Sequence, residues 1–207
     1  MRVIAGTHRS RQLIAPRGDA TRPTSDRLRE TLFNILSPRI PNCRFADLYA
    51  GTGAVGIEAL SRGAAHVFFA ENAAPALKSL RTNLRNLKIA GDFALEDRGV
   101  MPLLQRLAKS STALDPVLNI VFLDPPYTDE EAYTQTLGFL GSPANRALLA
   151  PGAIVIAEHA TKSPFQLPER IGTLARTRLY KQGDTSLSFY SARQEQDRNG
   201  NERDKSG

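Results

Sequence analysis

The sequence has little cysteine and little histidine: its 207 residues include one cysteine, Cys43, and three histidines. A single cysteine excludes an intramolecular disulfide and is typical of a reducing compartment. The first residues, 1–7, lack the apolar core of a signal peptide. No apolar run approaches the roughly 18 residues of a membrane-spanning helix. We therefore expect a cytoplasmic protein without a membrane partner.

The potential metal ligands are scattered along the chain as His8, His66, His159 and Cys43, with no zinc spacing among them. Each is better explained by a structural role, and we expect no bound metal. No Ser-His-Asp arrangement stands out. The glycine-rich stretch 51–56 is not followed by Gly-Lys-Ser/Thr, which excludes a phosphate-binding P-loop.

Positive charge is concentrated near the beginning of the chain. The formal net charge is +6, and residues 1–30 hold seven arginines against three acids. The arginines are Arg2, Arg9, Arg11, Arg17, Arg22, Arg27 and Arg29. A basic surface of this kind is consistent with a polyanionic partner, because phosphates bind arginine without regard to base sequence. For any single arginine, a solvated surface position is the alternative.

The chain divides into three parts by composition. Residues 1–20 contain two short strand-like runs around a basic turn, which predicts a β-hairpin. Residues 21–192 read as the main domain. Residues 193–207 carry equal numbers of acidic and basic side chains and no large apolar one, so we expect a disordered tail.

Strand-like and helix-like segments alternate through the main domain, which predicts an α/β fold with a mostly parallel sheet and helices on both faces. Two late runs joined by Gln182-Gly183-Asp184 predict an antiparallel hairpin at one edge. The seven expected strands are 43–49, 66–70, 93–95, 120–123, 153–158, 174–181 and 185–190. The expected helices are 25–36, 57–62, 75–87, 100–108 and 130–140.

A nucleoside-containing cofactor is indicated by residues 51–56, which fit G-x-G-x-x-G between a strand and a helix. Glu71 follows twenty residues after Gly51, where an acid can accept hydrogen bonds from a ribose. Asp97 ends the third strand and could meet an adenine amine, with Glu96 as its competitor for that role. A solvent-facing helix cap is the alternative for Asp97. The glycine pattern alone leaves NAD open.

Residues 120–130 begin as a buried strand and end in Asp124, Pro125, Pro126 and Tyr127. An exocyclic amine on a nucleobase is a poor nucleophile that needs fixed acceptors for its N–H bonds. The Asp124 carboxylate and a Pro125 carbonyl held still by the prolines can supply them. The Tyr127 ring offers a face for stacking the base. The alternative is a strand-ending turn with an incidental acid and tyrosine.

Residues 47–53 followed by residues 124–127 resemble the class I S-adenosylmethionine-dependent amino-methyltransferases, which have a Rossmann-like fold. Residues 21–36 and 51–63 closely resemble the bacterial 16S rRNA guanine-N2 methyltransferases of the small ribosomal subunit. The resemblance runs from about Arg2 to Ala192. Ser10 departs from it, since the family usually has glycine there, and so does the pair of acids at 96–97.

The resemblance implies roles for individual residues. The methionine part of S-adenosylmethionine would be held by Asp47, Ala50, Gly51, Thr52 and Gly53. Glu71 with Asn72 would hold the ribose, and Asp97 the adenine amine. Asp124 to Tyr127 would present the guanine N2 to the methyl group, and Asp124 would also contact the cofactor. Phosphate contacts are expected from Arg2, Arg9, Arg11, Arg22 and Arg27.

The sequence therefore predicts a monomeric enzyme that methylates the N2 amine of a guanine in 16S rRNA. One alternative is the same chemistry on adenine N6 in DNA or RNA, because Asp-Pro-Pro-Tyr does not separate the two bases. Another is a non-catalytic RNA-binding assembly factor of the same fold. An NAD enzyme is disfavoured by the two prolines that follow Asp124.

Overall fold

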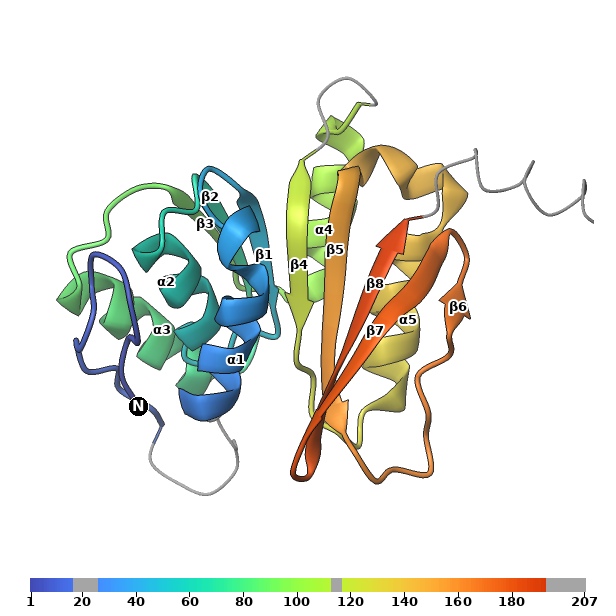
Figure 1. Cartoon of the computed structure of the whole chain (residues 1–207). Helices are drawn as coiled ribbons and strands as arrows, with labels where there is room; N and C mark the ends of the chain where they lie inside the picture. Colours follow the sequence, from blue (N-terminus) through green and yellow to red (C-terminus); the bar gives the residue numbers. More distant parts are fainter. Residues whose placement is uncertain (17–25, 113–116, 193–207) are drawn as a thin grey trace, which may run out of the picture.

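The structure is a computed structural model that describes residues 1–16, 26–112 and 117–192. The first residue of the predicted helix 25–36 lies outside these ranges, and so do Arg22 and the predicted disordered tail. A single sheet of eight strands forms the centre of the described chain, with helices on both faces (Figure 1). This arrangement confirms the predicted α/β, Rossmann-like class.

The strands are ordered β3-β2-β1-β4-β5-β8-β7-β6 across the sheet. Strands β1 to β5 are parallel, and β8, β7 and β6 continue the sheet in antiparallel pairing. Their bounds are β1 Arg44–Leu48, β2 His66–Ala70, β3 Phe93–Glu96, β4 Leu118–Leu123, β5 Leu149–Ala160, β6 Arg170–Ile171, β7 Leu174–Gln182 and β8 Thr185–Ala192.

All seven predicted strands are present, but the predicted count of seven was wrong by one. The eighth strand, β6, has two residues and pairs with the start of β7. Two residues are too few to show the alternation of apolar and polar side chains by which a strand is recognised in a sequence.

Helices cover the two faces in separate groups (Figure 1). One face is covered by α1 (Asp26–Leu36), α2 (Ala54–Ser61) and α3 (Ala74–Asn86), and the other by α4 (Val100–Ser110) and α5 (Glu130–Gly141). Short 3-10 helices follow α1 at Ser37–Arg39 and α5 at Pro143–Leu148. Successive side chains of a strand point to opposite faces of the sheet and so pack in different cores. Phe45 packs in the core under α1, α2 and α3, and Ala46 in the core under α4 and α5.

The direction in which the chain adds strands reverses between β1 and β4. From β1 the chain proceeds to β2 and β3 on one side, and β4 then returns to pair with the other side of β1. In open parallel sheets a crevice forms at the carboxyl ends of the strands at such a reversal. Leu48 lies opposite Leu123 there, so the segments that follow β1 and β4 are neighbours.

The N-terminal segment, residues 1–16, folds back on itself through an antiparallel bridge between Arg2 and Gln12. Val3 and Leu13 are buried in the core beneath α1 and α2. The Glu58 carboxylate of α2 accepts the Ile4 and Ala5 backbone N–H groups at 2.7 and 2.9 Å. The segment is therefore fixed to the helix that follows the glycine-rich turn.

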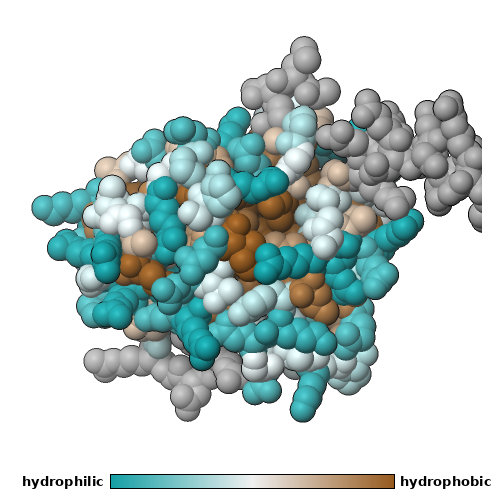
Figure 2. Space-filling view, viewed as in Figure 1, coloured by the Kyte–Doolittle hydropathy of each residue, from teal (hydrophilic) through white to brown (hydrophobic). Residues whose placement is uncertain are grey.

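Figure 2 shows hydrophobic side chains gathered near the middle of the face viewed in Figure 1, with hydrophilic side chains around them. Ile14 and Leu179 are large apolar side chains with substantial exposure, at 47% and 41%. Within the described ranges, no helix has both the length and the apolar character needed to cross a membrane.

Two glycine substitutions should separate packing from helix propensity. A Cβ on Gly56 of α2 would lie 2.2 Å from the Phe69 ring, whereas one on Gly138 of α5 would meet nothing within 4 Å. Gly56→Ala should lower the free energy of unfolding by about 1–2 kcal/mol, because overpacking outweighs the gain in helix propensity. The control, Gly138→Ala, should raise it by up to about 1 kcal/mol. Urea unfolding measures both, and equal effects would contradict the packing argument.

Candidate active site

The glycine-rich turn between β1 and α2 requires left-handed backbone at three positions. Tyr49, Gly51 and Gly53 have φ values of 62°, 56° and 77°. A Cβ on Gly53 would lie 2.2 Å from Leu80 Cδ1, so this glycine allows the turn to pack closely on α3. Gly51 faces open space, with nothing within 4 Å of the position of a Cβ. The turn therefore has one tightly packed side and one side that a ligand can approach.

Asp47 lies in β1 directly beneath this turn and is 2% exposed. Its Oδ2 accepts the backbone N–H of Gly56, in the first turn of α2, at 2.8 Å. The pKa of the Asp47 carboxyl is raised from 3.8 to about 8, mainly by burial and to a smaller extent by the nearby charge of Glu71, while the hydrogen bond from Gly56 lowers it. At neutral pH this carboxyl therefore mostly keeps its proton, and a cationic ligand beside it would bind with release of that proton.

Glu71 organises the turn from the end of β2. Its Oε2 accepts the Gly51 N–H at 2.8 Å, and its Oε1 accepts the N–H groups of Asn72 and Ala73 at 2.8 and 2.7 Å. A carboxylate offers about four acceptor positions. Three are used within the chain, which leaves room for one hydroxyl of a ligand beside Gly51.

The two acids at the end of β3 have different partners. Glu96 is buried and pairs with Arg98 at 2.8 Å and with Arg106 at 3.7 Å. The hydrogen bond from Arg98 is the main reason that the pKa of Glu96 is lowered. Asp97 has a half-exposed side chain that pairs with Arg81 of α3 at 2.9 Å. Asp97 is thus the more accessible acid, and its role at an adenine stays a prediction.

The segment after β4 begins beside the end of β1. The Asp124 N–H donates to the Leu48 carbonyl at 3.3 Å, which extends the pairing of the two strands by one residue. Asp124 is partly buried, Pro125 is buried and Pro126 is exposed. The Pro126 carbonyl accepts the Asp129 N–H at 2.8 Å, closing a turn that leads into α5. The Asp124 side chain therefore stands on a backbone that both neighbouring strands and prolines constrain.

The Tyr127 ring is held by its hydroxyl. This hydroxyl donates to Glu158 Oε1 at 3.0 Å and lies 3.2 Å from Thr185 Oγ1. Burial and the Glu158 charge raise the pKa of Tyr127, so the phenol stays neutral. The Tyr133 hydroxyl links the same two segments. It donates to the Glu158 carbonyl at 2.7 Å and lies 3.4 Å from the Pro125 carbonyl oxygen.

Sequence reasoning missed Glu158, Thr185 and Tyr133 as parts of this site. Glu158 is 3% exposed and follows the apolar run of β5, so an acid at the end of a buried strand was the available signal. Thr185 comes from β8 and Tyr133 from α5, far apart in sequence. Nothing local in the chain indicates that these two side chains meet Tyr127 or Glu158.

Tyr49 was also missed, although it lies within the segment 47–53. Its hydroxyl lies 2.7 Å from Thr136 Oγ1 of α5 and donates to the Ala132 carbonyl at 3.3 Å. A non-glycine residue at positive φ carries backbone strain, which is commonly found at functional sites. Tyr49 therefore ties the glycine-rich turn to the helix that follows Tyr127.

The predicted cofactor residues of β1 and its turn, namely Asp47, Ala50, Gly51, Thr52 and Gly53, lie at the same sheet edge as Glu71 and Asp124. Thr52 also accepts, through its carbonyl, the Asn83 side-chain amide at 3.0 Å. Arg2, Arg9, Arg11 and Arg27 are exposed, and Arg22 lies outside the described residues. The described part of the chain holds no group of three His, Cys, Asp or Glu residues placed to bind a metal.

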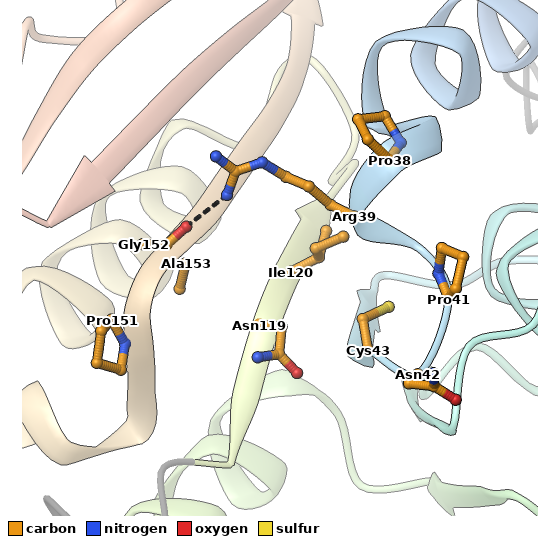
Figure 3. Close-up of a pocket in the computed structure, with 10 residues that line it drawn as sticks. All are labelled: Pro38, Arg39, Pro41, Asn42, Cys43, Asn119, Ile120, Pro151, Gly152 and Ala153. Atoms are coloured by element: carbon orange, nitrogen blue, oxygen red, sulfur yellow. Dashed lines mark hydrogen bonds between the residues drawn. The ribbon is translucent and has the colours of Figure 1, made fainter.

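A cavity of about 270 Å³ lies at the opposite, amino edge of the sheet (Figure 3). It is lined near the starts of β1 and β4 by Cys43 and Asn119, and Arg39 closes one side by donating to the Gly152 carbonyl at 2.8 Å. None of the predicted site residues lines it. The candidate site is therefore the carboxyl edge, where the predicted residues converge.

Solved structures share this architecture. The Escherichia coli protein yhhF is 32% identical, with a TM-score of 0.74 over 93% of this chain and 97% of that chain. An RNA methyltransferase from Salinibacter ruber, solved in complex with S-adenosyl-L-homocysteine, is 14% identical, with a TM-score of 0.58 over 84% of this chain and 95% of that chain. At that identity the second likeness shows the fold alone.

Sequence comparisons identify the family. A protein of Haemophilus influenzae named ribosomal RNA small subunit methyltransferase D is 34% identical over 82% of this chain and 83% of its own length. The family described as conserved hypothetical protein 95 matches residues 1–191. The predicted family is thereby confirmed: the chain belongs to the conserved hypothetical protein 95 family, among relatives that include ribosomal RNA small subunit methyltransferase D.

Proposed function

We propose that the protein transfers a methyl group from S-adenosylmethionine to the exocyclic N2 amine of a guanine in 16S rRNA. The observation that carries this proposal is the position of Asp124, at the end of β4 and directly beside the glycine-rich turn that follows β1. The group that would hold the amine and the residues that would bind the cofactor thereby lie side by side at one edge of the sheet. The relatives named as small subunit rRNA methyltransferases support the choice of rRNA.

The residues at the edge suit S-adenosylmethionine. Asp47 is a desolvated carboxyl that would lose its proton and pair with a cationic group such as the amino acid ammonium, because an opposite charge lowers a carboxyl pKa. Glu71 keeps one acceptor position beside Gly51 for a ribose hydroxyl, and Asn72 continues the loop from β2. When bound, the cofactor supplies an electrophilic methyl group.

The Asp-Pro-Pro-Tyr segment positions the amine. The Asp124 carboxylate and the Pro125 carbonyl are acceptors that would orient the two N–H bonds and localise the nitrogen lone pair, without forming a covalent bond to the base. Tyr127 presents a ring fixed through its hydroxyl, so base stacking would lose little side-chain entropy. Guanine reaches such a pocket only when it is turned out of its helix.

Asp47→Asn should make the protein relatively more stable at high pH while weakening cofactor binding. The folded-state pKa of about 8 lies above the ordinary 3.8, so the wild-type chain loses stability as pH rises from about 4 to about 8. The variant keeps an acceptor for Gly56 and lacks this loss. Its Tm relative to wild type should therefore rise from pH 5 to pH 8.5. Calorimetric affinity for S-adenosylhomocysteine should fall about tenfold or more; unchanged affinity would contradict the assignment.

Asp124→Ala should lower turnover by about 100-fold or more, because an oriented polar group is lost at the reacting centre. The measurement uses labelled cofactor and small ribosomal subunits that lack the modification. Asp129→Ala is the matched control: Asp129 caps α5 by accepting the Ala132 N–H at 3.0 Å, so stability should fall by about 1 kcal/mol with turnover kept.

Analysis of the methylated nucleoside separates the candidate functions in the same experiment. N2-methylguanosine at one rRNA position is the expected product. N6-methyladenosine would show that the enzyme instead methylates the N6 amine of adenine. Cofactor binding without any transfer in the wild-type chain would favour an assembly factor. Full activity of Asp124→Ala would remove the catalytic role of that residue.

The exposed arginines of the N-terminal segment, Arg2, Arg9 and Arg11, are proposed phosphate contacts, together with Arg27 of α1. Reversing the charge of Arg9 and Arg11 should weaken binding to rRNA. It should also flatten the salt dependence, because fewer phosphate contacts mean that binding releases fewer counterions. Filter binding at several salt concentrations measures the slope. An unchanged slope would show that this segment does not contact phosphate.

A further inference from the structure

A strongly basic surface flanks the open edge of the sheet at β3. In the described chain β3 pairs with β2 on one side and with no strand on the other. Helices α3 and α4 flank it, and residues 78–109 carry seven basic side chains against Asp92, Glu96 and Asp97. The exposed basic residues are Lys78, Arg81, Arg85, Lys88, Arg98, Arg106 and Lys109. We call these residues and the groove described next the β3-edge surface.

Local acids neutralise only part of this charge. Asp97 pairs with Arg81, and the buried Glu96 pairs with Arg98 and Arg106. Arg85, Lys88 and Lys109 make no ion pair within the described residues. The cations that remain therefore favour a polyanion at this edge.

An apolar groove of about 540 Å³ runs between α3 and β3. Its floor is formed by the side chains of Leu84, Ile89, Phe93 and Leu95, and its rim by Arg81, Arg85 and Lys88. A nucleic acid strand suits this combination, because phosphates bind the basic rim while the flat face of a base or sugar packs on the apolar floor.

Lys88 occupies a position where the backbone favours glycine. It follows the end of α3 with a φ of 57°, and its N–H donates to the Arg85 carbonyl at 2.9 Å. Helices commonly end in a glycine at such a left-handed residue. The lysine adds strain there and a charge at the rim of the groove, so helix termination does not account for it.

We infer that the β3-edge surface is a second rRNA contact, which binds the backbone of a single-stranded segment flanking the target nucleotide. The inference rests on the proposed function. Three strand spacings separate β4 from β3, roughly 14 Å. A strand whose target base lies at Asp124 would cross this distance along the carboxyl edge to Arg81, which pairs with Asp97 after β3. Because α3 runs back toward the start of β3, the strand would then follow α3 from Arg81 to Arg85 and Lys88, roughly 10 Å further.

The test compares Arg85→Glu and Lys88→Gly with Arg170→Glu. Arg170 is an exposed arginine on β6, at the opposite edge of the same sheet. Binding of a 16S rRNA transcript is followed by fluorescence anisotropy over a range of salt concentrations. Arg85→Glu and Lys88→Gly should each weaken binding and reduce the salt slope by about 0.7, as expected for one lost contact to a single strand. Arg170→Glu should leave the slope unchanged.

Folding and cofactor binding are measured in parallel. Lys88→Gly should have a Tm no lower than wild type, because glycine relieves the left-handed backbone, and its affinity for S-adenosylhomocysteine should be unchanged. Equal salt slopes in wild type, Arg85→Glu and Lys88→Gly would overturn the second contact alone. Absence of transcript binding in the wild-type chain would overturn the proposed rRNA substrate and the inference with it.

Discussion

The pairing of β1 with β4 is the constraint on which the site depends. These strands are distant in sequence, but Leu48 and Leu123 face each other and the Asp124 N–H continues the ladder to Leu48. Side chains alternate along a strand, so a slip of one residue would exchange Ile120 and Phe122, which pack in one core, with Val121 and Leu123, which pack in the other. The two hydrophobic cores therefore fix the register, and the register sets the glycine-rich turn beside Asp-Pro-Pro-Tyr.

Asp47, Glu58 and Glu71 are three buried acids of β1, α2 and the end of β2, and they differ in how many hydrogen bonds they accept. Glu58 accepts two backbone N–H groups of the N-terminal segment, and Glu71 accepts three around the turn. Asp47 accepts one from Gly56, and its pKa is raised by burial. The hydrogen bonds that Glu58 and Glu71 accept within the chain offset most of the cost of burying their charge, although Glu71 keeps one acceptor position for a ligand. Asp47 is the acid of the three that is best suited to a ligand outside the chain.

The sequence predicted most of the architecture, because buried strands and amphipathic helices leave strong local patterns. The apolar run of β4, the leucines of α3 and the Gly-rich turn each specify their element with short-range information. The prediction was weaker for the N-terminal segment, which forms a bridge between Arg2 and Gln12 and shares the main core through Val3 and Leu13. Its attachment to Glu58 depends on where α2 lies, and no local pattern shows that.

For the site, residue type and order were enough to predict the chemical groups: an acid with two prolines and a tyrosine after one strand, and glycines with an acid around another. These groups predict a nucleoside-containing cofactor, which the resemblance narrows to S-adenosylmethionine. They also predict a site that holds an exocyclic amine. The contacts around these groups appear only in the folded chain. They include the hydrogen bonds from the N-terminal segment to Glu58 and the contacts of Glu158 and Thr185 with the Tyr127 hydroxyl. The tertiary structure also decided the left-handed backbone of Tyr49 and the desolvation of Asp47. These depend on packing between segments far apart in the chain, and the pKa of Asp47 is raised because the elements packed around it exclude water.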